Sequence, residues 1–181
     1  MAIEMDYAMI KESPKALSAA ATGLGYSKMA VLSVSVAEFI RNLGYKAIPM
    51  GNDTALSIPL AIDAGLGELG RHGRLITEQY GPRVRLCKVF TFLPLVPDKP
   101  IDMGQQEFCE NCGACAEECP GKAISAGKRT TEPASVSNNK GGLLKWPINA
   151  YNCFKNWYPP KVGVDCTHCI AICTKNQPPK A

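Results

Sequence analysis

The distribution of cysteine constrains this chain more than any other feature of its sequence. Nine cysteines occur among 181 residues, and eight of them lie after position 108. A secreted scaffold held by disulfides would be shorter, with its cysteines spread more evenly. Clustered Cys-x-x-Cys spacing indicates metal ligands instead. We therefore expect the second half of the chain to fold around metal, which would supply folding free energy that its weak apolar periodicity does not.

The first cysteine group has the spacing C-x-x-C-x-x-C-x-x-x-C-P, which is typical of bacterial iron–sulfur proteins. Its members are Cys109, Cys112, Cys115 and Cys119. Three closely spaced thiolates hold one [4Fe–4S] cluster, and the fourth ligates the other cluster in two-cluster proteins. A structural zinc site is the alternative, but it needs only Cys-x-x-Cys pairs and would leave thiolates unused. The pattern predicts an iron–sulfur centre.

In the second group, a long gap separates the first cysteine from the other three, which keep the x-x and x-x-x spacing. Its members are Cys153, Cys166, Cys169 and Cys173. Thr174 follows the last cysteine, where a proline would be usual. In two-cluster proteins the fourth cysteine of each motif binds the cluster of the other motif, which predicts one cluster on Cys109, Cys112, Cys115 and Cys173. The same rule assigns the other cluster to Cys119, Cys153, Cys166 and Cys169.

Several residues around these groups carry weaker signals. Cys87 lies in the apolar segment RLCKVF and is expected to be a small buried hydrophobe. His168 lies between two predicted ligands, and we expect it to face solvent rather than to bind metal. Four aromatic residues are expected to pack over the second cluster and limit its access to water, or simply to fill the core. They are Trp146, Tyr151, Trp157 and Tyr158.

The first hundred residues have the alternating pattern of an α/β fold. Strands are expected over residues 2–10, 46–49 and 85–91. One helix should begin at Ser13-Pro14 and end at Gly23 and Gly25. Further helices are expected over residues 27–43, ending at Gly44, and over 54–64, which contains Pro59. The composition changes near Pro100, so we predict an α/β domain over residues 1–104 and a ferredoxin-like domain with two [4Fe–4S] clusters over 105–181.

Composition argues against several other classes of protein. No run approaches the length of apolar residues that spans a membrane. The first residues have no basic start followed by an apolar stretch, so they do not look like a signal peptide. The formal net charge of +4 is modest, and no basic stripe with interleaved aromatics predicts binding to nucleic acid.

Several segments resemble a known family when they are taken in order. GYSKMA (25–30), FIRNLGYKAIP (39–49), AGLGELGRHGRLIT (64–77), YGPRVR (80–85) and TFLPLVPDKPID (91–102) precede FCENCGACAEECPGKAI (108–124). This order resembles the catalytic subunit of corrinoid-dependent reductive dehalogenases, in a superfamily that includes epoxyqueuosine reductase. The resemblance implies a nitroreductase-like part that binds a cobalamin-type corrinoid in its base-off form. Consistently, His72 and His168 lack the Asp-x-His-x-x-Gly context of a lower axial ligand.

The same resemblance implies a catalytic site. Tyr26 matches the tyrosine that donates the proton replacing the halide, and Arg85 matches its cationic partner, with Arg83 as a weaker candidate. Asn52 matches a polar residue of the substrate pocket. A nearby cation stabilises tyrosinate and makes the phenol a better proton donor. The implied corrinoid contacts are Ser27, Lys28 and Met29.

The implied reaction is the reductive dehalogenation of an organohalide, such as a chlorinated ethene, with electrons delivered through two clusters. The implied partners are a reduced electron donor and a small membrane-anchor protein at the outer face of the cytoplasmic membrane. Two alternatives stay open. One is an enzyme like epoxyqueuosine reductase that acts on a modified nucleoside in tRNA. The other is a ferredoxin-type electron carrier without catalysis, which would not need the α/β part.

The sequence also departs from the family pattern. Family members are usually more than twice as long and usually begin with a twin-arginine signal, which is not present here. Phe92 stands where an aspartate is usual, and the chain stops shortly after Cys173. We therefore interpret the chain as an internal or C-terminal piece of a longer enzyme, inactive by itself, in which a missing N-terminal half would close over the corrinoid.

Overall fold

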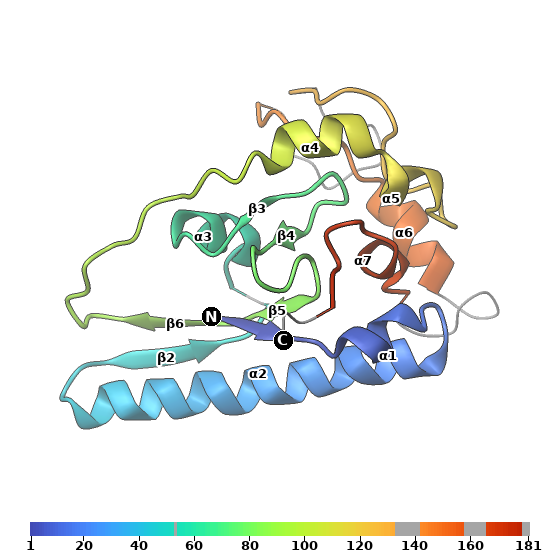
Figure 1. Cartoon of the computed structure of the whole chain (residues 1–181). Helices are drawn as coiled ribbons and strands as arrows, with labels where there is room; N and C mark the ends of the chain where they lie inside the picture. Colours follow the sequence, from blue (N-terminus) through green and yellow to red (C-terminus); the bar gives the residue numbers. More distant parts are fainter. Residues whose placement is uncertain (53, 133–141, 158–165, 179–181) are drawn as a thin grey trace.

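A long helix runs along one side of the molecule, and the first cysteine-containing helices lie on the opposite side (Figure 1). The computed structural model describes residues 1–52, 54–132, 142–157 and 166–178. The N-terminal elements are β1 (Ala2–Glu4), α1 (Tyr7–Lys11), α2 (Ala16–Asn42), β2 (Ala47–Met50), α3 (Ser57–Asp63), β3 (Glu68–Leu69), β4 (Leu75–Ile76), β5 (Val84–Leu86) and β6 (Lys88–Thr91). The cysteine-containing part adds α4 (Gln105–Cys112), α5 (Ala114–Glu117), α6 (Ala150–Trp157) and α7 (His168–Ala171).

The strands form three antiparallel pairs instead of the single α/β sheet that alternation predicted. β1 pairs with β5, β2 with β6, and β3 with β4. The segment predicted as one strand over 85–91 is therefore two strands, divided at Cys87. Its first half pairs Arg85 with Ile3, and its second half pairs Phe90 with Ile48. Sequence periodicity reports that a segment is extended, but it does not report which partner each half will find.

Two predicted helices are one continuous helix. Gly23 and Gly25 lie inside α2, so the prediction that they end a helix was wrong. A glycine costs a helix about 1 kcal/mol relative to alanine, which tertiary packing can offset. At Gly25 the reason is close approach, because an added Cβ would lie 2.9 Å from Cγ of Arg85. The predicted end at Gly44 is confirmed, with a backbone φ of +90° just after the helix.

Two other elements are shorter than expected. The strand predicted over 2–10 stops at Glu4, because the carboxylate of Asp6 caps α1 by accepting a hydrogen bond from the Met9 N–H at 2.8 Å. The helix predicted over 54–64 begins at Ser57. Pro59 therefore lies in its first turn, where a missing N–H costs no helical hydrogen bond.

The apolar core is divided into small clusters, two of which lie on the inner side of α2. Met5, Ile10 and Ala21 pack with Ile170 of α7. A second cluster joins α2 to the β2–β6 pair through Ala37, Ile40 and Ala47. The cysteine-containing tail is thus packed against the N-terminal helices, and the division into domains 1–104 and 105–181 stays a prediction.

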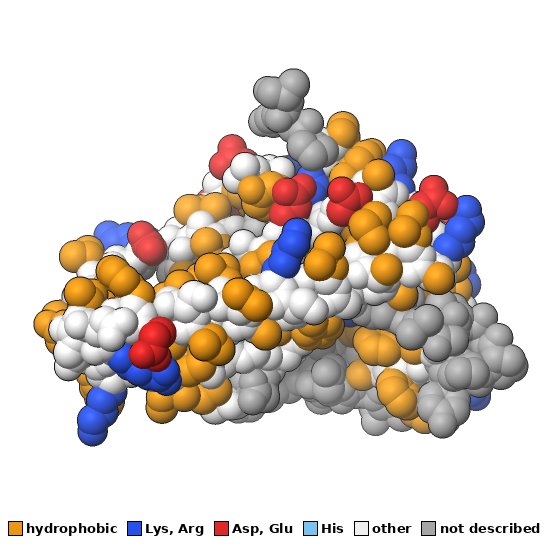
Figure 2. Space-filling model, turned by 90° about the horizontal axis from the view of Figure 1, so that it is seen from below, with side chains coloured by type: hydrophobic (Ala, Val, Ile, Leu, Met, Phe, Trp, Pro, Cys, Tyr) orange, Lys and Arg blue, Asp and Glu red, His pale blue; other side chains and the backbone are white. Residues whose placement is uncertain are grey.

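The outer side of α2 keeps hydrophobic side chains at the surface, as the view from below shows (Figure 2). The most exposed of these on the helix are Val31, Phe39 and Val34. No helix in the part of the chain that the structure describes is both long and apolar enough to cross a membrane.

Candidate iron–sulfur centre and tyrosine site

The first predicted set of thiols comes together from segments far apart in sequence. Cys109 and Cys112 lie on α4, Cys115 lies on α5, and Cys173 follows α7. All four line one small cavity. Cys109 and Cys173 also pack with Ile76 and Trp146 in one apolar cluster, although more than sixty positions separate the two cysteines. These four thiols therefore lie together in the structure, and their role as the ligands of one cluster stays a prediction.

The second set is drawn together in the same way, as the raised pKa values of Cys153 and Cys169 indicate. Burial raises the pKa of the Cys153 thiol, and repulsion from Cys119 and Cys166 adds to the effect, while Arg74 lowers it. Burial raises the pKa of Cys169 to about 11, against the opposing effect of Arg74 and with repulsion from the other three thiols. Such mutual repulsion requires that the four sulfur atoms share one neighbourhood.

The two sets adjoin one another through Cys115 and Cys169. Both residues belong to the packed cluster that includes Ala116 and Ile124. The pKa of Cys115 is raised to about 12, first by burial and then by repulsion from Cys169, Cys173 and Cys109. Centres held by the two sets would therefore lie close enough to exchange electrons.

The arrangement of these thiols fits polynuclear clusters better than a single ion. All nine cysteines are free thiols, so disulfides do not explain the grouping. Within the described ranges, no three His, Cys, Asp or Glu side chains are placed to hold one metal ion, as a zinc site requires. A [4Fe–4S] cluster spreads its four thiolates over four irons. Binding iron would also replace protons that these buried thiols otherwise keep.

Hydrogen-bond donors are directed at the cysteine sulfurs. The buried side chain of Gln105 donates from Nε2 to Sγ of Cys109 at 3.1 Å. The backbone N–H of Ala123 donates to Sγ of Cys119 at 3.3 Å, and Nδ2 of Asn156 donates to Sγ of Cys166 at 3.5 Å. Donors of this kind stabilise negative charge on sulfur and contribute to the reduction potential of iron–sulfur clusters.

Trp146 lies beside a different set of cysteines than the sequence suggested. It was expected over the second set, but it is buried against Cys109 and Cys173 of the first. The isolated bridges Ile124↔Ile148 and Thr130↔Lys145 fold this segment back toward α4, and pairing at such range leaves no local signal. Trp157 does lie at the second set, since its side chain is near enough to Cys153 to lower the pKa of that thiol.

The remaining expectations around the cysteines had mixed outcomes. Tyr151 is 61% exposed and points away from the core, and Tyr158 lies outside the described residues. Cys87 is buried, as predicted. His168 was expected to face solvent, but it is half-buried and its Nδ1 atom is fully buried without a hydrogen-bond partner in the described structure.

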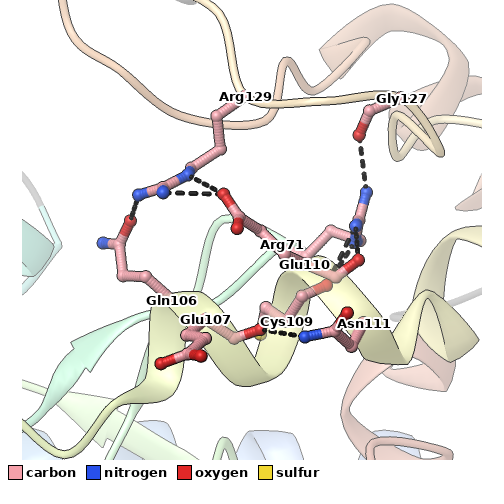
Figure 3. Close-up of polar contacts among 8 residues, drawn as sticks. All are labelled: Arg71, Gln106, Glu107, Cys109, Glu110, Asn111, Gly127 and Arg129. Atoms are coloured by element: carbon pink, nitrogen blue, oxygen red, sulfur yellow. Dashed lines mark hydrogen bonds and ion pairs between the residues drawn. The ribbon is translucent and has the colours of Figure 1, made fainter.

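A buried arginine that the sequence analysis did not single out organises the first cysteine motif (Figure 3). The guanidinium of Arg71 donates to the carbonyl oxygen of Cys109 at 3.1 and 2.9 Å. It also donates to the carbonyl oxygens of Ser125 at 2.9 Å and Gly127 at 3.0 Å. The group lies 4.6 Å from the ring centre of Trp146. Arg71 and the adjacent His72 belong to the segment AGLGELGRHGRLIT. The resemblance of that segment to the family was the signal that could have pointed to them.

Three residues predicted for catalysis meet at one place on the surface of α2. Nδ2 of Asn52 donates to the phenol oxygen of Tyr26 at 2.8 Å, and Nη1 of Arg85 donates to the same oxygen at 3.4 Å. The Arg85 guanidinium lies 4.6 Å from the centre of the Tyr26 ring. Gly25 leaves the room that this arrangement needs. The contact joins α2, the end of β2 and β5.

The other predicted residues lie around this contact. Ser27 and Lys28 are exposed beside Tyr26 on α2, whereas Met29 is buried beneath them. Arg83, the weaker candidate for the cation, is fully buried elsewhere. It pairs with Glu4 and donates to the carbonyl oxygens of Met5 and Gln177, so it has a structural role.

The cysteine arrangement and the first motif together define an iron–sulfur protein. Residues 105–125 match the family model described as a 4Fe-4S binding domain. The chain is 45% identical over 171 residues to a tetrachloroethene reductive dehalogenase of Sulfurospirillum multivorans, covering 94% of this chain and 34% of the relative. The chain is therefore a homologue of part of the reductive dehalogenases. It spans about a third of the length of the curated relatives it matches.

Solved structures agree with this relationship. A catabolic reductive dehalogenase superposes with a TM-score of 0.87 at 30% identity, covering 100% of this chain and 26% of that chain. Another reductive dehalogenase, described as an enzyme of B12-dependent dehalogenation, gives a TM-score of 0.83 at 29% identity, covering 98% of this chain and 25% of that chain. An epoxyqueuosine reductase of Lactococcus garvieae is more distant, at 29% identity over 83% of this chain and 40% of the relative.

Proposed function

We propose that this chain is the part of a reductive dehalogenase that carries electrons to a corrinoid and a proton to the substrate. The observation that carries the proposal is the gathering of eight thiols into two adjacent sets of four, Cys109, Cys112, Cys115 and Cys173 in one and Cys119, Cys153, Cys166 and Cys169 in the other. Each set would hold one [4Fe–4S] cluster. Their packing at Cys115 and Cys169 supports electron transfer between the two.

The surface of α2 would contribute to a nitroreductase-like corrinoid site. Ser27 and Lys28 offer polar side chains there, and Met29 supports them from beneath. When bound, a corrinoid supplies the cobalt at which the carbon–halogen bond is cleaved. A base-off form without a protein ligand is supported by the placement of both histidines, because His72 is buried and His168 adjoins the second set of cysteines.

The proton would come from the phenol of Tyr26. Two donors point at its oxygen, Nδ2 of Asn52 and Nη1 of Arg85, so negative charge left on that oxygen after proton release would be stabilised. The arginine also holds the ring through its position over the aromatic face. Asn52 and Arg85 therefore orient the phenol and favour its ionised form, while Tyr26 itself would transfer the proton.

The substrate class follows from the relatives. Several homologues are tetrachloroethene reductive dehalogenases, and we infer that a chlorinated ethene or a similar organohalide is the substrate of the longer protein. A reduced electron donor would supply two electrons for each halide released. A small membrane-anchor protein would hold the enzyme at the outer face of the cytoplasmic membrane.

Metal analysis after anaerobic reconstitution tests the assignment. We expect about eight irons and about one cobalt per chain when iron, sulfide and cobalamin are supplied. Iron without cobalt would favour the electron carrier, and turnover of epoxyqueuosine without halide release would favour the other reductase. In the full-length protein, Tyr26→Phe should abolish chloride release from tetrachloroethene while both metals stay bound. Normal release from that variant would refute the proton-donor role.

A further inference from the structure

A buried histidine next to the first set of cysteines has one ring nitrogen accounted for and one that is not. His72 is 5% exposed and lies in the turn between β3 and β4. Its Nδ1 atom accepts a hydrogen bond from the backbone N–H of Arg74 at 3.1 Å. A nitrogen that accepts a hydrogen bond carries no proton, so in the neutral ring the proton is on Nε2. His72 is therefore a donor through Nε2.

That donor is fully buried and has no acceptor among the residues that the structure describes. A buried N–H without an acceptor is energetically costly, so native proteins rarely keep one. Gly70 is shaped to admit the ring, because an added Cβ there would lie 2.8 Å from Cε1 of His72. Both observations indicate that the ring is positioned for an acceptor that the described residues do not supply.

The cavity beside His72 identifies that acceptor. His72 lines the same small cavity as all four thiols of the first set, Cys109, Cys112, Cys115 and Cys173. A [4Fe–4S] cluster bound to four thiolates carries net negative charge, and its sulfur atoms accept hydrogen bonds. Arg71 also lines this cavity, but its N–H groups already donate to backbone carbonyls. Among the described side chains that line this cavity, His72 is the one with a buried N–H that has no acceptor.

We propose that Nε2–H of His72 donates a hydrogen bond to a sulfur atom of the cluster held by this first set and thereby raises its reduction potential. The inference rests on the proposed cluster. Reduction adds one electron, and the added negative charge strengthens an N–H···S hydrogen bond, so the reduced form is stabilised more than the oxidised form. His72 is thus a positioning residue for electron transfer.

Two substitutions separate the hydrogen bond from the bulk of the side chain. His72→Leu removes the donor and keeps apolar volume, whereas His72→Gln places an amide N–H close to the original Nε2 position. His168→Leu is the matched control, because His168 is the only other histidine in the chain and adjoins the second set. Each protein is reconstituted anaerobically with iron and sulfide, and each cluster is titrated by electron paramagnetic resonance.

We expect His72→Leu to change the reduced-to-oxidised ratio of one cluster about tenfold at a fixed potential, which equals a downward shift of about 59 mV for one electron. His72→Gln should restore most of the shift. In wild-type protein made with nitrogen-15-labelled histidine, pulsed electron paramagnetic resonance should detect a hyperfine coupling between that nitrogen and the reduced cluster. The coupling should persist in His168→Leu and disappear in His72→Leu.

Unchanged potentials in His72→Leu, with the iron content of the wild type, would overturn the proposal. So would a labelled-nitrogen coupling that disappears in His168→Leu and persists in His72→Leu. Wild-type protein that binds no clusters would instead contradict the proposed function, so the two failures are distinguishable. If His72→Leu does not fold, His72→Gln provides the same test. A coupling from labelled histidine that persists when position 72 is glutamine would exclude His72 as its source and overturn the proposal.

Discussion

Replacing Arg71 by methionine should destabilise the protein far more than the same change at Arg129. Both guanidinium groups lie over Trp146, at 4.6 Å for Arg71 and 5.5 Å for Arg129. They differ in burial and in partners. Arg71 is 4% exposed and donates to backbone carbonyls, whereas Arg129 is partly exposed and pairs with Glu110 at 2.7 Å.

The expected magnitude follows from these contacts. Arg71→Met leaves the carbonyl oxygens of Cys109, Ser125 and Gly127 without this donor. A hydrogen bond to a charged group contributes about 1.5–3 kcal/mol, and a buried acceptor left unpaired costs about 1–3 kcal/mol. Allowing for relaxation, we expect a loss of about 3–5 kcal/mol. The ion pair of Arg129 is accessible to water, so its loss should cost at most about 1 kcal/mol.

Thermal unfolding of the reconstituted protein, followed by circular dichroism, measures this difference. For a chain of this size, each kcal/mol corresponds to about 2–4 °C in Tm, so Arg71→Met should lower Tm by about 10 °C and Arg129→Met by less than about 3 °C. Arg71→Lys keeps the charge without the planar fork and should fall between them. Equal shifts for the two methionine variants would refute the reasoning that the buried carbonyl contacts stabilise the first cysteine motif.

Three further predictions use other parts of the chain. Gly81→Ala should reduce iron binding, because Gly81 has a φ of +57° and an added Cβ would lie 2.0 Å from a backbone oxygen just after Cys173. Gly44→Ala is the control: an added Cβ would meet nothing within 4 Å, so the unfolding free energy should fall by only about 1 kcal/mol and the iron content should stay unchanged. Metal-free protein should lose about 1.4 kcal/mol of unfolding free energy per pH unit as pH rises from about 9 toward about 12, because folded Cys115 keeps a proton that the unfolded chain releases. Urea titrations across this range measure the loss, and an unfolding free energy that does not change with pH would contradict the prediction. Gly25→Ala in the full-length protein should displace Arg85 and lower chloride release with metal content intact, and unchanged turnover would separate this arginine from catalysis.

The sequence by itself determined the chemistry of the cysteine-rich part. Thiol spacing is a local property, and the first motif alone indicated a 4Fe-4S binding domain, which the family model over residues 105–125 confirms, while the division of eight ligands between two clusters stays a prediction. The resemblance likewise named Tyr26, Asn52 and Arg85, which meet at one oxygen atom in the structure. The helical face over 27–43 and the end of the helix at Gly44 were also readable, since 3.6-residue periodicity and C-terminal glycine are local signals.

Only the tertiary structure decided how distant segments complete one another. The division of 85–91 into two strands depends on β1 and β2, and the continuity of α2 through Gly25 depends on Arg85 packing across it. Trp146 reaches the first cysteines, and Arg71 finds its carbonyl partners, through contacts between residues far apart in the chain. Such contacts arise from burial and hydrogen-bond satisfaction in three dimensions, so no pattern in a neighbouring stretch of sequence encodes them.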